Sequence, residues 1–538
     1  MSLRMCAPSQ AAIAVRLPVY ITIIMDENMS VPPPYDPKDK NSFAYVTVVD
    51  RWPSIITNLI NSVSQTLHDL STSSALGTQG VFPAKIAEGK RIIETASKLK
   101  YDMARDRPLG PIIGDGGSNI ELYNQQLQAF ETTSQNTWFS CPWLYAECYL
   151  YRLMRSWFAT TQHWSQFDPF FAQKEETFKS SGAAVYQLAL TMSELDREAE
   201  KSSLDTDLER LEVLFDEMIQ MCLWGNATDL SLLTTLSSAD IERLQSVGKE
   251  AQAASRQYIL RDDIDVAWNH VKGLKNARLD IVLDNAGFEY FTDLILADFL
   301  VTHTPFFGSV TFHSKDIPWF VSDVTPPDVR AILSALASVP TTLLTTSTAA
   351  SAPEGNGYFA SLPPSQGHLD ALHKLRYRWL KYFENGTFKI YGCPGLDGNF
   401  SGGPKNDAAV VKGAMRDDPD SGSPAAFWTG PDPYWKLIEH PGMAGLEGSK
   451  LVIFKGDLNY RKLTGDLQWP MSTPFGTALG AFAGKLPVLS LRTSKADVVV
   501  GLREGVGEAM DKDESKRGWK VNGRYALISY EPQVEASS

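Results

Sequence analysis

The spacing of apolar residues changes character partway along this 538-residue chain. From residue 42 to about 270, apolar side chains recur at three- and four-residue intervals, as in Asp50–His68, Lys85–Asp102 and Leu204–Ile219. This period is typical of amphipathic helices. Proline and glycine fall mainly between such stretches, where helices end. The pattern predicts an α-helical domain over residues 42–270.

Beyond about residue 271, short β-branched runs alternate with helical stretches. Strands that are buried on both faces of a sheet have this composition, and helices between them indicate crossover connections. The runs predicted to be strands are 280–283, 309–312, 319–321, 451–454, 488–491, 497–500 and 525–530. The sequence therefore predicts an α/β fold: a Rossmann-like αβα sandwich with a mostly parallel sheet over residues 271–538.

Three other segments lack this order. Residues 1–41 form an N-terminal extension that we expect to be disordered, because its apolar run is interrupted and offers no signal-peptidase site. Stretches near 338–364 and 395–424 are rich in glycine, serine and proline, and we predict surface insertions there. No run approaches the roughly 20 apolar residues of a transmembrane helix. We therefore expect no membrane partner.

Composition narrows the classes of partner. The net charge of −13 lacks the basic footprint that nonspecific nucleic-acid binding requires, so we expect no nucleic-acid partner. The five cysteines show neither zinc-ribbon nor CxxC spacing, and the eight histidines include no HExxH pair. Sparse thiols are typical of an intracellular protein, so we expect a cytoplasmic location, with the nucleus as an alternative. The sequence does not set an oligomeric state.

Polar side chains follow two of the predicted strands. Asp284 and Asn285 follow the first one, and Asp323 follows the third. Ligands of open α/β sheets bind at the carboxyl ends of strands, and oxygen donors there suit Mg²⁺ or Mn²⁺. The alternative is structural: Asp284 or Asn285 would cap the helix that begins near Glu289, and Asp323 would be a turn residue.

Two further segments place charged groups at predicted strand ends. Asp457, Asn459 and Arg461 follow the fourth predicted strand, and the planar guanidinium of Arg461 can hold a phosphate or sugar hydroxyls. Lys495 ends the tetrapeptide RTSK after the fifth predicted strand. Its ammonium would neutralise a phosphoryl group as a point charge. The alternatives are ordinary surface polarity for the first segment and a solvated basic loop for the second.

A carboxylate also lies within a densely aromatic stretch, Trp138–Phe158. Glu147 is surrounded there by large apolar groups, and a buried carboxylate needs a partner. We expect Arg152 or Arg155 to supply the partner. The alternative is that Glu147 closes over a substrate.

Together these segments resemble the DUF89 family of damage-control phosphatases, in the branch named both sugar phosphate phosphatase and acidic residue methyltransferase. The resemblance spans roughly residues 42–530. The segments that carry it are LDNAGFEYFTDLILAD (283–298), FHSKDIPWFVSD (312–323), FKGDLNYRKLTGD (454–466), LRTSKAD (491–497), FAYVTVVDRWP (43–53) and WFSCPWLYAECYLYR (138–152).

The resemblance implies a helical N-terminal domain, a Rossmann-like catalytic domain and hydrolysis of sugar phosphates such as fructose 1-phosphate and fructose 6-phosphate in metabolite damage control. It implies a divalent metal, Mn²⁺ or Mg²⁺, with Co²⁺ or Ni²⁺ as alternatives. The metal ligands that it implies are Asp284, Asn285 and Asp323. The substrate-binding residues that it implies are Asp284, Asn285, Asp457, Leu458, Asn459, Tyr460, Arg461 and Lys495. The catalytic residues in this scheme are Asp284, Asp323 and Lys495.

The favoured hypothesis is thus a divalent-metal-dependent phosphomonoester hydrolase whose partner is a small phosphorylated metabolite. Direct attack by water and attack by Asp284 as nucleophile both stay open. The alternative activity is an S-adenosylmethionine-dependent protein-glutamate O-methyltransferase. Such enzymes usually carry a glycine-rich loop after the first strand, and here Gly287 is the one glycine in that place. A third hypothesis is a metabolite-binding protein without turnover.

Overall fold

The computed structural model describes residues 31–74, 82–200, 207–225, 256–339, 358–359, 364–391 and 424–534. Most of the predicted N-terminal extension and of the two predicted insertions lies outside the described residues. Among the helices described, none combines the length and the hydropathy that crossing a membrane requires.

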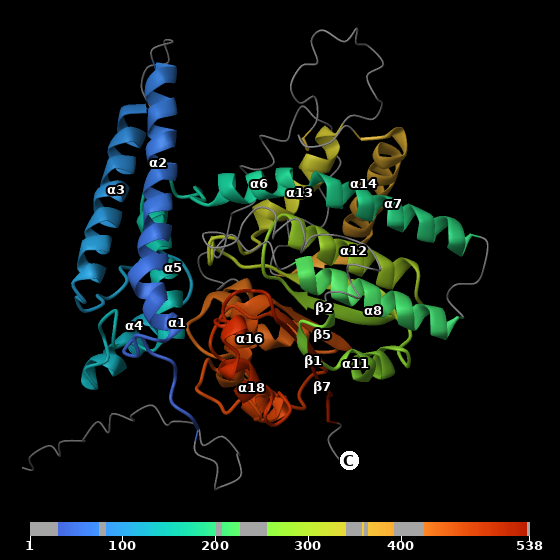
Figure 1. The fold of residues 1–538 in the computed structure, drawn as a ribbon. Coiled ribbons are helices and arrows are strands. Elements are labelled where there is room, and N and C mark those ends of the chain that lie inside the picture. The colour runs from blue at the N-terminus through green and yellow to red at the C-terminus, as the bar shows by residue number, and fades with distance from the viewer. Residues whose placement is uncertain are drawn as a thin grey trace, which may run out of the picture.

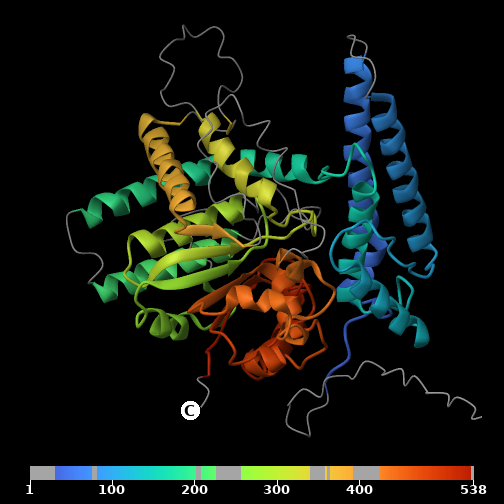
Figure 2. The same ribbon diagram turned by 180° about the vertical axis from the view of Figure 1, so that it is seen from behind.

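Helices build the first part of the chain, as the three- and four-residue spacing predicts. They are α1 (Phe43–Val46), the π-helical turn η1 (Thr47–Arg51), α2 (Trp52–Ser74), α3 (Phe82–Ala104), α4 (Ile120–Thr132) and α5 (Trp143–Ala159). The long helices α2 and α3 pack side by side and stand beside the rest of the molecule (Figures 1 and 2). Buried aromatic residues, Trp52, Trp138 and Trp143 among them, form the core of this helical part.

Three further helices precede the sheet in sequence: α6 (Phe171–Ser180), α7 (Gly182–Ala199) and α8 (Leu208–Gly225). The apolar face of α8, with Leu211, Phe215 and Ile219, is buried in the same cluster as the sheet. In Figure 1, α6 leads from the helical part across to α7, which lies over the α/β part. The division of the chain into domains at residue 270 therefore stays a prediction.

One sheet of seven strands lies within the described residues, in the order β1-β7-β6-β5-β2-β3-β4. The strands are β1 (Ile259–Asp262), β2 (Ala277–Val282), β3 (Phe307–His313), β4 (Phe388–Ile390), β5 (Leu451–Lys455), β6 (Val488–Thr493) and β7 (Ala526–Glu531). Neighbouring strands are parallel, except for the antiparallel pair β6–β7. The predicted α/β fold with a mostly parallel sheet is confirmed.

Helices cover both faces of this sheet. Successive side chains of a strand point to opposite faces, and here the side chains on both faces are apolar and buried. Ile453 of β5 packs in one apolar cluster with α7, α8 and the helices α11 (Ile264–Val271), α12 (Phe288–Thr302), α13 (Pro326–Ser338) and α14 (Gln366–Asn385). Its neighbours Val452 and Phe454 pack in a second cluster, on the other face. The elements near that face are α16 (Gly456–Thr464), α17 (Phe475–Leu479), α18 (Val506–Lys512) and the 3₁₀ turns η4 (Pro424–Thr429), η5 (Tyr434–Lys436), η6 (Pro441–Leu446), η7 (Gly480–Phe482) and η8 (Glu514–Lys516).

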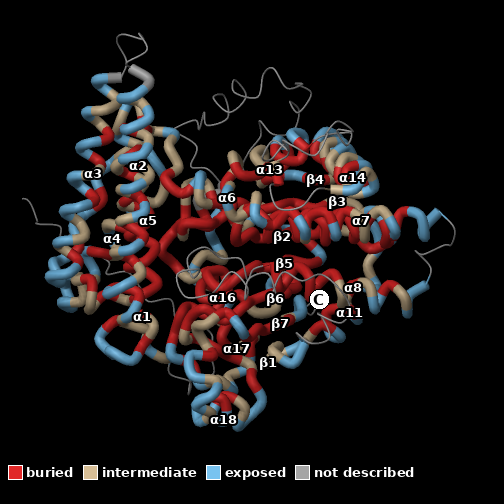
Figure 3. Tube along the Cα trace, turned by 45° about the horizontal axis from the view of Figure 1, so that its top comes forward, coloured by how far each residue is buried: buried red, intermediate tan, exposed pale blue. Residues whose placement is uncertain are grey.

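The centre of the sheet is the most buried part of the fold. Every residue of β5 is buried, and the neighbouring β2 and α12 are buried along most of their lengths (Figure 3). The described cysteines, Cys141, Cys148 and Cys222, are free and buried. Burial raises the pKa of the Cys148 thiol to about 11, so this thiol stays protonated at neutral pH.

Two predicted strands are wrong. Residues 319–321 form a turn, because Phe320 and Val321 adopt positive φ angles that no strand contains. Residues 497–500 pair with no strand, and the guanidinium of Arg492 donates to the carbonyl groups of Ala496 and Val498. Conversely, the short edge strands β1 and β4 were not predicted, and β1 lies within the segment expected to be helical.

Candidate active site

A pocket opens where the carboxyl ends of β2 and β5 meet the helical part. It holds about 390 Å³ of space, the open solvent at its mouth included. Its lining residues are Arg51, Glu147, Asp284, Asn285, Phe320, Asp323, Asp457, Leu458, Arg461 and Lys495. Seven of these were singled out from the sequence as site residues. The structure therefore brings most of the predicted site into one place.

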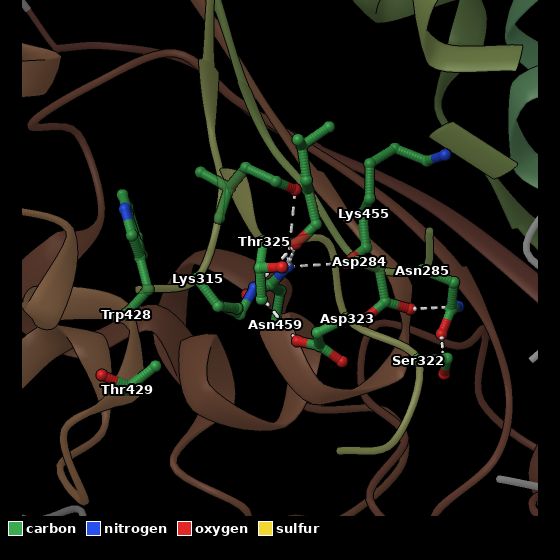
Figure 4. A network of polar contacts seen from close by, with 12 residues as sticks. Asp284, Asn285, Lys315, Ser322, Asp323, Thr325, Trp428, Thr429, Lys455 and Asn459 are labelled. Atoms are coloured by element: carbon green, nitrogen blue, oxygen red, sulfur yellow. Dashed lines mark hydrogen bonds and ion pairs between the residues drawn. The ribbon is translucent and has the colours of Figure 1, made fainter. Parts of the chain in front are cut away.

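The three predicted metal ligands are neighbours. Asp284 and Asn285 follow β2, whereas Asp323 reaches them from a loop rather than from the end of a strand. Asn285 and Asp323 form an isolated antiparallel bridge, and the main-chain N–H of Val324 donates to the carbonyl of Asp284 at 2.8 Å. Figure 4 shows the three side chains gathered in one region. Main-chain pairing thus fixes their proximity.

The carboxamide of Asn285 is held from three sides. Its Nδ2 donates to Oδ2 of Asp284 at 2.9 Å and to Oε2 of Glu289 at 2.7 Å, while Oγ of Ser322 donates to its Oδ1 at 2.5 Å (Figure 4). The alternative that Asp284 or Asn285 caps the next helix is wrong. The N-cap of α12 is Gly287, and no side chain caps this end.

The carboxylate of Asp284 lies against the main chain at the start of α16. A Cβ atom on Gly456 would lie 1.8 Å from Oδ2 of Asp284, and Gly456 has a φ of +80°. Both observations require glycine at this position. The first turn of α16 and the predicted ligand are therefore packed with no room for a side chain between them.

The donor set fits a hard divalent cation. Asp284, Asn285 and Asp323 are 4%, 2% and 1% exposed, and they offer oxygen atoms alone. Lys315 Nζ lies 3.3 Å from Oδ2 of Asp323 and offsets part of the acidic charge. Within the described ranges, no cluster of three or more histidine, cysteine, aspartate or glutamate side chains forms a metal cage. Two carboxylates and a carboxamide match Mg²⁺-like ions, which bind through few protein ligands and complete their shell with water or phosphate.

Helix α16 lies in the interior, and all nine of its residues are buried. The alternative of ordinary surface polarity for this segment is wrong. Oδ1 of Asp457 accepts a hydrogen bond from Nε of Arg492 at 2.7 Å and from the main-chain N–H of Lys495 at 2.9 Å. Asp457 therefore ties the RTSK loop to α16. Lys495 is only 5% exposed and lines the pocket, so the alternative of a solvated loop is also wrong.

Arg461 joins the pocket to the helical part. Its Nη1 donates to Oε2 of Glu147 at 2.6 Å, its Nη2 donates to Oδ2 of Asp466 at 2.9 Å, and its Cζ lies 3.7 Å from the centre of the Trp143 ring. Burial alone would lower the pKa of Arg461, but the carboxylates of Asp466 and Glu147 outweigh it and raise the pKa. The guanidinium therefore stays charged inside the protein.

The predicted pairing of Glu147 with Arg152 or Arg155 is wrong, because Glu147 forms its ion pair with Arg461 of α16. Arg152 pairs instead with Asp115, through two hydrogen bonds of 2.7 and 2.9 Å. Residues five positions apart lie on different faces of a helix, so Arg152 points away from Glu147. Glu147 faces α16 and lines the pocket, and its Oε1 accepts a hydrogen bond from Nε1 of Trp52 at 3.2 Å.

Two predicted substrate-binding residues have side chains outside the pocket lining. Asn459 Nδ2 donates to the carbonyl groups of Lys455 at 2.7 Å and of Leu283 at 3.2 Å, which fastens α16 to the end of β2. The hydroxyl of Tyr460 accepts the main-chain N–H of Val500 at 3.0 Å. These side chains hold the site together. That Asn459 and Tyr460 contact substrate stays a prediction.

Arg51 and Phe320 line the pocket but were not singled out from the sequence. Arg51 ends the π-helical turn η1, and such turns recur at functional sites. The ring of Phe320 stacks on Tyr151 with 4.7 Å between ring centroids. Both residues fall inside segments that carry the family resemblance. The spacing of polar and apolar residues around Arg51 and Phe320 does not indicate that either residue lines a site.

Comparison with known proteins agrees with the family resemblance that the sequence motifs indicate. A family model described as the damage-control phosphatase ARMT1-like domain matches residues 47–510. Damage-control phosphatase ARMT1 of Xenopus tropicalis is 31% identical over 509 residues, which cover 92% of this chain and 98% of the relative. The human protein of that name is 29% identical over 515 residues, covering 93% and 99%.

A crystal structure of a DUF89 family protein from Pyrococcus horikoshii also matches, with 13% identity and a TM-score of 0.33, over 88% of this chain and 98% of that chain. A score this low carries no weight in the assignment. The family model and the relatives each match nearly the whole length of the helical and α/β parts. The chain therefore belongs to the ARMT1-like family of damage-control phosphatases.

Proposed function

We propose that this protein is a divalent-metal-dependent phosphatase that hydrolyses small sugar phosphates of the fructose 1-phosphate and fructose 6-phosphate type. Family membership supports phosphatase activity. One observation carries the finer statement: a single small pocket contains two carboxylates and a carboxamide together with the cationic side chains of Arg461 and Lys495. A pocket that binds a phosphate ester next to a metal ion needs oxygen ligands for the metal and cationic side chains for the phosphate.

Asp284, Asn285 and Asp323 would hold the cation, with Mn²⁺ or Mg²⁺ favoured by their oxygen donors and Co²⁺ or Ni²⁺ as alternatives. When bound, such an ion polarises phosphoryl oxygens and lowers the pKa of a neighbouring water. Asn285 contributes its carboxamide oxygen, since Oδ1 has a second lone pair beyond the one that Ser322 uses.

The remaining lining residues act on the ester. Lys495 and Arg461 would bind the phosphoryl oxygens and offset the charge that builds on them in the transition state. The N-terminal end of α16, where Leu458 lines the pocket, adds the partial positive charge of a helix terminus. Arg51 and Glu147, which line the pocket on the helical side, would hydrogen-bond the hydroxyl groups of the sugar.

The test is a panel of phosphate-release assays with fructose 1-phosphate and fructose 6-phosphate, each with Mn²⁺, Mg²⁺, Co²⁺ or Ni²⁺ and with a chelator. We expect release that requires metal, and we expect Asp284→Ala to abolish it with an unchanged circular dichroism spectrum. Full activity of Asp284→Ala, or of the chelated enzyme, contradicts the proposal. Calorimetric binding of S-adenosylmethionine without any phosphate release would instead favour the methyltransferase alternative.

A further inference from the structure

Lys174, on α6, is a buried lysine whose ammonium group contacts the main chain of the predicted metal ligand Asp323. Its Nζ donates to Oδ2 of Asp328 at 2.9 Å, to Oδ2 of Asp168 at 3.0 Å and to the main-chain carbonyl of Asp323 at 3.1 Å. An ammonium group has three protons, and here each has a partner. A side chain of the helical segment thus holds the main chain of a predicted metal ligand.

The loop that carries Asp323 is strained. Phe320 has a φ of +43° and Val321 a φ of +70°, a region that bulky and β-branched residues rarely adopt. Each such residue costs about 1–3 kcal/mol, and the conformation persists only where its surroundings enforce it. Contacts from outside the loop must therefore keep Asp323 beside Asp284 and Asn285.

Those contacts come from three directions. The bridge with Asn285 ties the loop to the end of β2, and the ring stack between Phe320 and Tyr151 ties it to α5. On the third side, the main-chain N–H of Thr325 donates to Oδ2 of Asp328 at 2.8 Å, in the capping box of α13. The same oxygen of Asp328 accepts from Lys174, so this lysine joins α6, the start of α13 and the loop.

The side chain of Lys174 stays protonated inside the protein. Burial alone would lower its pKa, but Asp168 and Asp328 outweigh burial and raise it. The pair of carboxylates also makes the lysine hard to replace, because without it the buried carboxylate of Asp328 and the partly buried carboxylate of Asp168 would have no cation between them.

We propose that Lys174 is a positioning residue of the active site: it clamps the strained 319–325 loop so that Asp323 faces Asp284 and Asn285. Through this clamp, α6 sets the spacing of the cation-binding oxygens. The identity of the ion that Asp323 helps to bind rests on the proposed function. The clamp itself rests on the geometry of Lys174 alone.

Amide hydrogen exchange of the full-length, metal-free protein tests the clamp without any assay of activity. In Lys174→Met, we expect exchange at Val324 and Ala286, whose N–H groups bond across the bridge, to become at least tenfold faster. Exchange at the parental rate would overturn the inference.

The matched control is Arg378→Met. Arg378 also lies between two carboxylates, those of Asp196 and Asp298, but on α14, away from the pocket lining. We expect it to lower stability without changing exchange at Val324. Equal acceleration in both variants would show general loosening of the fold and would overturn the inference as well.

A second variant guards against failure to fold. Lys174→Met combined with Asp328→Asn removes one of the carboxylates left without a cation, and the introduced amide oxygen can still accept from Thr325. Asp328→Asn alone is its control. The double variant should show the same fast exchange at Val324, and a parental rate would overturn the inference.

Titration with Mn²⁺ by calorimetry tests the consequence for the metal. Loss of a group that orients a metal ligand costs about 10–100-fold in affinity, and we expect at least tenfold for both lysine variants. Parental affinity in a variant with fast exchange would overturn the metal part of the inference. A parental protein that binds none of Mn²⁺, Mg²⁺, Co²⁺ and Ni²⁺ would contradict the proposed function, while the exchange rates still decide on the clamp.

Discussion

The two walls of the pocket are held in different ways. The α/β wall contains Asp284, Asn285, Asp323 and the residues of α16, and the helical wall contains Arg51 and Glu147. On the α/β side, main-chain contacts place the chemistry: the Asn285–Asp323 bridge joins two segments, and Gly456 brings the start of α16 against Asp284. On the helical side, long side chains reach the pocket, and the ion pair between Glu147 and Arg461 joins the wall to α16. The α/β wall therefore has almost no freedom to adjust, whereas the helical wall can shift with its side chains.

This contrast sets the expected order of effects. A single methyl group added at Gly456 should disable the site, because it would overlap the buried side chain of Asp284 and displace this predicted metal ligand. Loss of one charge on the helical wall should weaken substrate binding but leave the fold and the chemistry largely intact.

The largest effect is expected for Gly456→Ala. The added Cβ would lie 1.8 Å from Oδ2 of Asp284, in a residue whose φ is +80°. We expect phosphate release to fall at least 100-fold, since a displacement of about 1 Å in a catalytic group has that effect. The free energy of unfolding should fall by about 3 kcal/mol, from the backbone cost and the overlap together.

Gly448→Ala is the matched control. Gly448 also has a φ of +80°, but a Cβ there meets nothing within 4 Å. It should show the backbone cost alone, about 1–2 kcal/mol, with normal activity. Equal loss of activity in the two variants would contradict the packing argument for Asp284.

A smaller effect is expected for Glu147→Gln, which keeps the shape of the side chain but removes its charge. Arg461 would keep Asp466 as its partner and lose one charge-assisted hydrogen bond, worth about 1.5–3 kcal/mol. We expect steady-state kinetics with a sugar phosphate to show KM raised about tenfold and kcat changed little.

The control for that change is Asp115→Asn, which weakens the buried pair between Asp115 and Arg152 elsewhere in the helical part. Its loss of stability should be similar and its KM unchanged. If KM rises equally in both variants, the Glu147–Arg461 pair does not link the helical wall to substrate binding.

The last prediction concerns the contact between the two walls and is measured as stability across pH rather than as activity. Oδ2 of Asp497, beside the RTSK loop, accepts the main-chain N–H of Phe43 at 2.9 Å. Burial raises the pKa of Asp497 from 3.8 to about 6. The folded protein therefore takes up this proton near pH 6, and the unfolded chain takes it up only near pH 4. The cost of burying the charge, on the order of 3 kcal/mol, is fully present above pH 6 and disappears as the pH falls towards 4.

Asp497→Asn should remove that cost, since the amide oxygen can still accept from Phe43. Urea unfolding across pH 4–7 should show the variant to be more stable than the parent at pH 7, with the difference shrinking towards pH 4. A difference that does not vary with pH would contradict the raised pKa.

The sequence was enough to predict the α/β wall because its residues follow strands. Polar groups directly after the β-branched runs that became β2 and β5 meet at one edge, since parallel strands end together. Asp323 was placed beside them for the wrong reason, as the end of a strand. A loop with two positive φ angles brings it there, and no periodicity reveals such a loop.

The helical wall could not be predicted in the same way. Glu147 and Arg461 are 314 positions apart, and their pairing depends on how α5 packs against α16. Helical spacing suggested Arg152, but spacing says nothing of a partner from another part of the fold. Arg51 and Lys174 were missed for the same reason: each acts through contacts that arise only when the helices meet the sheet.

The sheet also constrains the order in which this protein can be completed. Strand β1 (Ile259–Asp262) is the first strand of the described residues, yet its hydrogen-bonding neighbour is β7 (Ala526–Glu531), the last one. During synthesis β1 must wait for some 260 residues before its partner leaves the ribosome, and until then β6 also has an open edge. Loss of the final dozen or so described residues would therefore leave β1 without its strand partner and β6 paired with β5 alone, in a chain whose predicted catalytic residues are all present.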